Sequence, residues 1–283
     1  MLDYSAISFI TQSRLSMSNA MPTMFVPHGA PTFALRPGAA GAALATIAKK
    51  LPAPRAIIII SPHWDTAVPT VGSSAQPETV HDFGGFPEEL YRIQYPATGC
   101  PEGAQEVMQA IQAAGLPAEL APRQGLDHGA WVPLRLMFPE ADVPVIPLSL
   151  QSRAGPQQAY RLGQALAGLS EKGFLVIGSG NLTHNLQDYF VASRNDGQTP
   201  SYVRDFAEWI ADRVENQGIE ELLNYRVTAP SATRAHPTDE HLLPLYVAWG
   251  AAGADAKAER FYSGIDDYVL AMDAYTFTPQ HAA

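Results

Sequence analysis

Cysteine, charge and long apolar runs are all scarce in this sequence of 283 residues. The one cysteine, Cys100, excludes an internal disulfide and favours a reducing compartment. No run approaches the ~18 consecutive apolar residues of a membrane span. Charged residues make up only 16%, with 18 basic and 28 acidic side chains and no cluster of Lys and Arg. We therefore expect a cytoplasmic protein whose partners include neither nucleic acid nor a membrane.

The hydrophobic content is high by contrast, at 46%. Together with the chain length, it suits a single α/β domain with a sizeable core and argues against disorder. Residues 1–20 lack the basic start of a signal peptide, and Arg14 interrupts their apolar stretch. We expect an N-terminal extension there, partly disordered, followed by a folded domain over residues 21–283. Both a monomer and a homodimer are compatible with the sequence.

Four consecutive isoleucines at positions 57–60 predict a strand buried on both faces, as in the centre of a parallel sheet. Pro62 cannot donate to a ladder, so this strand should end at about Ser61, with His63 just beyond it. Further strands are expected at 23–26, 143–150 and 174–180, and a strand or hairpin at 260–278. Predicted helices alternate with them at 39–50, 102–115, 157–169, 201–216 and from 238 to about 251. This alternation predicts an α/β fold with a central, mostly parallel sheet flanked by helices.

Histidines follow three of these strands: His28, His63 and His184. Ligands bind at the carboxyl ends of strands in open α/β sheets, and neutral imidazole is the commonest metal ligand. The pattern predicts a metal site at this edge, to which His241 would point from the first turn of its helix. Each histidine also has a structural interpretation: backbone bonding for His63, a turn for His28 or His184, and a helix cap for His241.

The remaining histidines are less distinctive. His128 lies between Asp127 and Gly129 in a turn, and His81 opens a loop rich in glycine and aromatic residues, where it either supports the loop or contacts a substrate. We expect His236, before a proline, and His281 to be exposed. The sequence has no His-x-x-x-His spacing, Gly-x-Ser-x-Gly elbow, dinucleotide fingerprint or P-loop.

Taken together, the histidine motifs resemble those of the class III extradiol ring-cleaving dioxygenases, in particular the DOPA 4,5-dioxygenase type with its LigB-like catalytic subunit. The resemblance covers roughly residues 21–275, in the family's order. It is carried by Phe25-Val26-Pro27-His28-Gly29, Ile60-Ser61-Pro62-His63-Trp64, His81-Asp82-Phe83-Gly84-Gly85-Phe86-Pro87, Asp127-His128-Gly129-Ala130-Trp131, Gly178-Ser179-Gly180-Asn181-Leu182-Thr183-His184-Asn185-Leu186 and Glu240-His241-Leu242-Leu243-Pro244-Leu245.

The resemblance implies a catalytic domain that holds non-haem Fe(II) and opens the ring of a small, DOPA-like catechol with O2, giving a muconic semialdehyde. It implies His28, His63 and His241 as metal ligands, and His184 as a fourth ligand or a catalytic acid/base. His128 would be a second acid/base near the substrate, which His81 would also contact. Glu240 or His236 are alternatives to His241, and zinc is an alternative to iron because imidazole binds both. Arg36, Arg123 or Arg234 would bind a substrate carboxylate.

Two other functions compete with ring cleavage. A zinc-dependent hydrolase on the same scaffold would use the histidines to activate a bound water, with Glu240 or Asp127 as the base. A scaffold or interaction protein would keep the fold without the chemistry. The second is disfavoured because none of the expected ligand histidines is missing.

Overall fold

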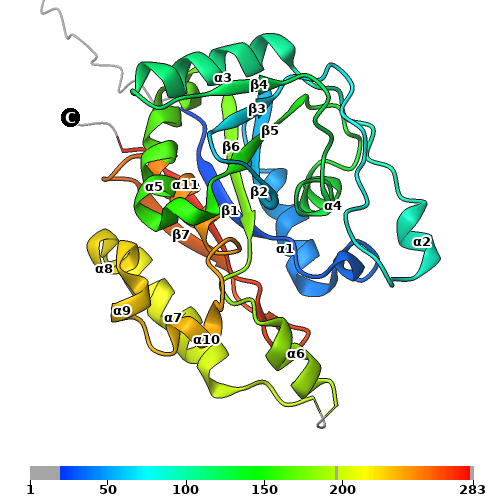
Figure 1. Cartoon of the computed structure of the whole chain (residues 1–283), viewed down its shortest axis with the longest axis vertical. Helices are drawn as coiled ribbons and strands as arrows, with labels where there is room; N and C mark the ends of the chain where they lie inside the picture. Colours follow the sequence, from blue (N-terminus) through cyan, green and yellow to red (C-terminus); the bar gives the residue numbers. More distant parts are fainter. Residues whose placement is uncertain (1–19, 195–196, 281–283) are drawn as a thin grey trace, which may run out of the picture.

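A computed structural model describes residues 20–194 and 197–280 of the chain. The expected N-terminal extension, apart from Ala20, and His281 lie outside these residues. The described part forms one α/β unit around an eight-stranded sheet of order β4-β3-β5-β2-β6-β1-β10-β7 (Figure 1). The strands are β1 Thr23–Pro27, β2 Ala56–Asp65, β3 Thr70–Gly72, β4 Glu119–Ala121, β5 Val145–Leu150, β6 Phe174–Gly180, β7 Lys257–Tyr262 and β10 Ala274–Thr278.

The centre of the sheet is parallel, which confirms the predicted α/β class. Strands β5, β2, β6 and β1 run in one direction. At one edge β10 pairs antiparallel with β1 and β7 pairs antiparallel with β10, and toward the other edge β3 pairs antiparallel with β5. The four isoleucines of β2 are buried between β5 and β6. Because parallel strands place their carboxyl ends together, the segments after β1, β2 and β6 meet at one edge.

Helices cover both faces of the sheet (Figure 1). At one face α11 packs on β6 and β1 and α5 packs on α11, and at the other face α4 packs on β2 with α1 beside it. The helices are α1 Gly38–Ala48, α2 Glu88–Tyr91, α3 Pro101–Ala113, α4 His128–Met137, α5 Gly155–Leu166, α6 Leu186–Ala192, α7 Ser201–Glu215, α8 Ile219–Leu223, α9 Tyr225–Thr228, α10 Ala232–Ala235 and α11 Leu243–Ala252. No helix in residues 20–194 or 197–280 is long and apolar enough to cross a membrane.

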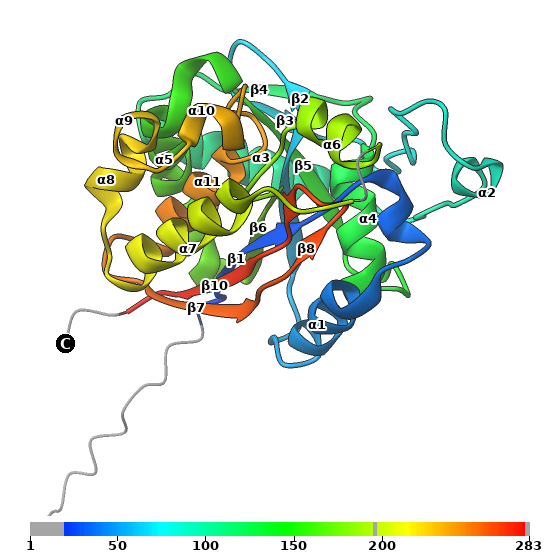
Figure 2. The same cartoon turned by 90° about the horizontal axis from the view of Figure 1, so that it is seen from below.

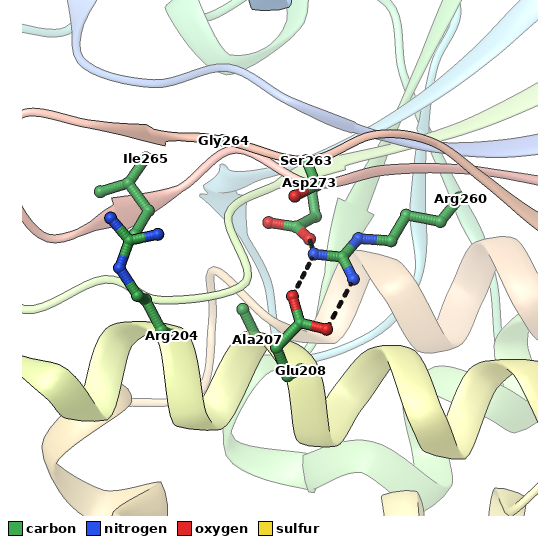
Figure 3. A pocket seen from close by; sticks show the side chains of 8 residues that line it. All are labelled: Arg204, Ala207, Glu208, Arg260, Ser263, Gly264, Ile265 and Asp273. Atoms are coloured by element: carbon green, nitrogen blue, oxygen red, sulfur yellow. Dashed lines mark hydrogen bonds and ion pairs between the residues drawn. The ribbon is translucent and has the colours of Figure 1, made fainter.

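A small hairpin and an ion-pair group complete the antiparallel side. Strands β8 (Ile265–Asp266) and β9 (Leu270–Ala271) form the hairpin between β7 and β10. The Arg260 guanidinium on β7 lies between Glu208 of α7 and Asp273, at 2.8 and 2.6 Å (Figure 3). This group fastens α7 to the sheet. Figure 2 shows β1, β10 and β7 side by side, so the first described strand lies against the last.

Two predicted boundaries are wrong. Strand β2 continues through Pro62 to Asp65. Its pairing with β6 stops at Ile60, and its ladder with β5 is irregular between Ile60 and Asp65. Because Pro62 lies in this unpaired stretch, its missing N–H breaks no hydrogen bond of the sheet. Helix α11 begins at Leu243 rather than near 238, with Pro244 in its first turn, where proline is favoured. His241 therefore lies in the turn before the helix.

The segment 226–237, expected as a loop, contains α9 and α10. Its His236 is fully buried rather than exposed: Nε2 bonds the Leu182 carbonyl at 2.8 Å, and the ring packs against Phe206 and Tyr225. Burial lowers the pKa of His236 to about 3, so the ring is neutral. Apolar neighbours contributed by α7 and α9 explain this burial.

Candidate metal centre and active site

Five histidines meet at the carboxyl edge of the sheet. His28 follows β1, His63 lies near the end of β2, His128 begins α4, His184 follows β6 and His241 precedes α11. All five line one cavity of about 660 Å³. The structure thus brings together every histidine predicted for metal binding or acid/base chemistry, at the edge predicted for the site.

Three of these rings surround a common point. The ring centroids of His28, His63 and His241 are 5.2, 5.3 and 5.2 Å apart, which makes an almost equilateral triangle. The Nε2 atoms of His28 and His63 face each other at 3.3 Å. Three neighbouring imidazoles provide the kind of donor set that a cation with three histidine ligands requires.

Hydrogen bonds fix the tautomer of His28. Ser179 Oγ donates its single hydrogen to the Gly129 carbonyl, so it accepts from His28 Nδ1–H at 3.0 Å. The lone pair of His28 is consequently on Nε2, the atom that faces His63 Nε2. Burial, with the neighbouring histidines, holds the pKa of His28 well below 6.5, so the ring is neutral, as a ligand must be.

Asp82 orients two histidines at once. Its carboxylate accepts from His128 Nδ1 at 3.0 Å and lies 3.6 Å from His63 Nδ1, and it also accepts the His128 backbone N–H. Burial is the largest single influence on Asp82 and opposes its ionisation, but the hydrogen bonds and charge effects of His128, with a smaller effect of His63, together outweigh it and hold the pKa at about 2. Burial, followed by the charge effect of His128, lowers the pKa of His63 to about 3. A carboxylate behind a histidine is the usual support of a metal ligand.

His184 and His241 form the other side of the site. Their rings stack in parallel with centroids 3.5 Å apart, and together with Glu240 they offer three ligand atoms within 4.8 Å of one another. His28, His63 and His128 form a second such group. Burial lowers the pKa of His184 to about 4 and that of His241 well below 6.5. The Nδ1 atom of His241 is buried without a hydrogen bond, 3.4 Å from Glu240.

Two glycines of β6 let the His241 segment approach. A Cβ on Gly180 would collide with the His241 carbonyl, and one on Gly178 would collide with that of Pro244. The His241 carbonyl instead accepts from Asn181 N at 3.0 Å. The Gly-Ser-Gly run thus brings the turn before α11 against the sheet, and it does not form a phosphate-binding loop.

Other predicted site residues lie apart. His81 does not line the cavity; its Nε2 bonds the Ile93 carbonyl at 3.0 Å and its ring packs near Phe83, Tyr91 and Trp131. None of the three arginines lines this cavity either: Arg234 pairs with Asp188, Arg123 is exposed, and Arg36 lines an adjoining cavity.

Asp82, Ser179 and Asp127 are site residues that histidine positions alone do not reveal. All three stand inside the motifs that carry the resemblance, which was the available signal. Asp127 is the N-cap of α4 and accepts from Ser61 Oγ at 2.6 Å. Because it is fully buried, its pKa rises to about 6. It connects the end of β2 to the helix that begins with His128.

Comparison with known proteins agrees with this geometry. Residues 39–275 match the family described as the catalytic LigB subunit of aromatic ring-opening dioxygenase. The chain is 39% identical over 267 residues to a 4,5-DOPA dioxygenase extradiol of Beta vulgaris, covering 93% of this chain and 98% of that protein. It is 35% identical over 238 residues to one of Escherichia coli K12, covering 83% and 86%.

A solved structure extends the likeness to the fold. The crystal structure of an uncharacterized protein from Escherichia coli K12 superposes with a TM-score of 0.74 at 29% identity, covering 90% of this chain and 99% of that chain. The relatives favour ring cleavage over both the hydrolase and the scaffold hypotheses. The chain belongs to the LigB family and is an extradiol ring-cleaving dioxygenase.

Proposed function

We propose that the chain opens the ring of a small, DOPA-like catechol with O2, using Fe(II) held by His28, His63 and His241. The equal spacing of the three rings is the observation that carries the proposal. A bound Fe(II) would hold the diol beside O2 and pass electrons between them. Three protein ligands leave positions free for both reactants. Cleavage next to the diol gives a muconic semialdehyde.

His128 and His184 serve the proton transfers of this proposal. Asp82 receives the Nδ1–H of His128, so the Nε2 lone pair is available to accept a proton from a catechol hydroxyl, and the carboxylate stabilises the imidazolium that results. His184, stacked on His241, lies close to the ligands as a fourth ligand or an acid/base. The contact with Asp82 supports His128 as the residue that accepts the substrate proton.

The cavity walls suit an aromatic substrate. Phe83, Phe86, Tyr189 and Phe190 line it, so a catechol ring leaving water finds apolar and aromatic surfaces beside the histidines. Two relatives are named 4,5-DOPA dioxygenase extradiol, which supports DOPA as a member of the substrate class. His81 would then act through the loop that carries Phe83 and Phe86.

Oxygen uptake tests the proposal. Protein reconstituted anaerobically with Fe(II) is mixed with DOPA, catechol, protocatechuate or caffeate, and uptake is followed together with visible absorbance. We expect uptake with a yellow product, and a loss of at least about 100-fold in His63→Ala together with loss of bound metal.

The matched control is His81→Gln, whose amide can still donate to the Ile93 carbonyl; we expect it to keep most of the activity. Absence of uptake with every catechol while iron is bound would contradict the proposal. Higher activity with Zn(II) than with Fe(II) would overturn the choice of metal, since an all-histidine site accepts both.

A further inference from the structure

The active-site cavity continues beyond the histidines. It shares Gly29, Ala30, Thr32, Tyr189 and Asp267 with a neighbouring cavity of about 440 Å³. Since the same five residues line both, the two cavities adjoin each other, and Asp267 lines the one that holds the histidines. A catechol whose ring lies among the histidines therefore has room for a side chain that extends toward Asp267, in the loop between β8 and β9.

The charge of this space is negative. Among the described residues that line the larger cavity, none is Lys or Arg, and Asp267 is the sole carboxylate. The neighbouring cavity adds Asp266 and Arg36, so two carboxylates stand against one guanidinium. In the described part of the chain, neither Asp266 nor Asp267 takes part in an ion pair within 4.0 Å.

We propose that Asp267 binds a protonated amine on the side chain of the catechol. The inference rests on the proposed function and adds a specificity-determining residue to it. A substrate with an ammonium group gains a charge-assisted hydrogen bond, whereas one with a carboxylate alone meets a like charge. A substrate that carries both groups can direct its carboxylate to Arg36. The enzyme should therefore rank amines first, amino acids next and carboxylic acids last.

Asp266 is half-buried, whereas Asp267 is exposed and lines both cavities. Desolvation raises the pKa of both carboxyl groups; the charge of Asp267 adds to this rise at Asp266, whereas Arg36 opposes it at Asp267. A cationic ligand would also oppose this rise. The Asp267 backbone has φ of +48°, a left-handed conformation in which asparagine, like aspartate, is favoured over most other residues. Asp267→Asn therefore removes the charge and keeps the turn.

The experiment compares three catechols on the Fe(II)-loaded enzyme: dopamine, 3,4-dihydroxyphenylpropionate and the neutral 4-methylcatechol. We expect Asp267→Asn to lower kcat/KM for dopamine about tenfold, mainly through KM, and to leave 4-methylcatechol unchanged. In the same variant, kcat/KM for 3,4-dihydroxyphenylpropionate should rise, because a like charge has been removed. Anaerobic calorimetry with dopamine gives the binding constant without turnover. Asp142→Asn, an exposed residue before the amino end of β5, removes the same charge at the opposite edge of the sheet.

The outcomes separate the two proposals. Cleavage of 4-methylcatechol by the wild type, with an equal loss for all three substrates in Asp267→Asn, would overturn the role of Asp267 and leave ring cleavage intact. A wild-type enzyme that prefers 3,4-dihydroxyphenylpropionate to dopamine would also overturn the role of Asp267 and leave ring cleavage intact. If no catechol is cleaved by the iron-loaded wild type, the proposed function itself fails, although calorimetry still measures whether dopamine binds through Asp267.

Discussion

Asp82 is the residue on which two histidines depend. One carboxylate faces Nδ1 of both His63 and His128, so it sets the tautomer of a proposed ligand and of a proposed base together. An asparagine of the same shape keeps one acceptor oxygen but turns an amide N–H toward the other ring. The two histidines therefore cannot both keep their Nδ1–H donors satisfied.

We expect Asp82→Asn to weaken metal binding about 10- to 100-fold, in the range of other residues that orient ligands. Competition with a chromogenic chelator measures the affinity, and circular dichroism checks the fold. Asp142→Asn is again the matched control. Metal affinity equal to that of the wild type would show that His63 keeps its orientation without the carboxylate.

The site residues also show how much of the active site can be predicted from the sequence. His28, His63, His128, His184 and His241 are identifiable because each stands in a motif at the end of an apolar segment. A motif contains no distances, however. Two features of the site depend on how the segment 65–101 folds over the sheet. Its course brings Asp82 to His63 and His128, and it turns His81 away to the Ile93 carbonyl.

At the scale of elements, long periodic segments were predictable and local boundaries were not. The isoleucine strand forms where it was predicted, although it continues to Asp65, and α7 lies close to its predicted bounds. The start of α11 was missed because a favourable helical pattern continues upstream of Leu243, while the chain there is bound to β6 through the His241 carbonyl. Tertiary contact outweighed local propensity at that point.

The ion pairs between α7 and the antiparallel edge of the sheet should contribute to stability. Arg260 is the cation between Glu208 and Asp273, and the Asp273 side chain is only 2% exposed. Burial raises the pKa of Asp273 to about 6, and Arg260 works against that rise. We expect Arg260→Met to lower the free energy of unfolding by about 3 kcal/mol, because it leaves a buried carboxyl group without its partner.

Urea unfolding of Arg260→Met measures this effect. The double variant Arg260→Met, Asp273→Asn should recover part of the loss, since it removes the stranded charge as well. A double variant that is less stable than the single one would show that hydrogen bonding to Asp273, rather than its charge, holds the edge together.

At the scale of the whole molecule, burial lowers the pKa of five of the histidines that the structure describes: His28, His236 and His241, which are buried, and His63 and His184, which are half-buried. Above pH 6.5 they are neutral in both the folded and the unfolded chain. Below pH 6.5, these imidazoles bind protons in the unfolded chain but stay neutral in the folded chain, for His236 down to about pH 3. The metal-free protein should therefore lose stability as the pH falls from 6.5.

His236→Gln isolates one of these contributions, because the glutamine amide can still donate to the Leu182 carbonyl. We expect the slope of unfolding free energy against pH to become shallower by about 1.4 kcal/mol per pH unit between pH 6 and 4. Urea titrations of the chelated protein at several pH values measure the slope. Identical slopes for variant and wild type would mean that His236 takes up its proton in the folded state.

The order of the strands has a consequence for synthesis on the ribosome. Strand β1 is made first, yet its neighbours in the sheet are β6 and β10, and β10 is the last strand of the described chain. Translation must therefore proceed through most of the message before β1 has both its neighbours. His28, directly after β1, likewise cannot meet His241 until residue 241 has been synthesised. Metal loading should accordingly be an event of the finished polypeptide, not of the nascent one.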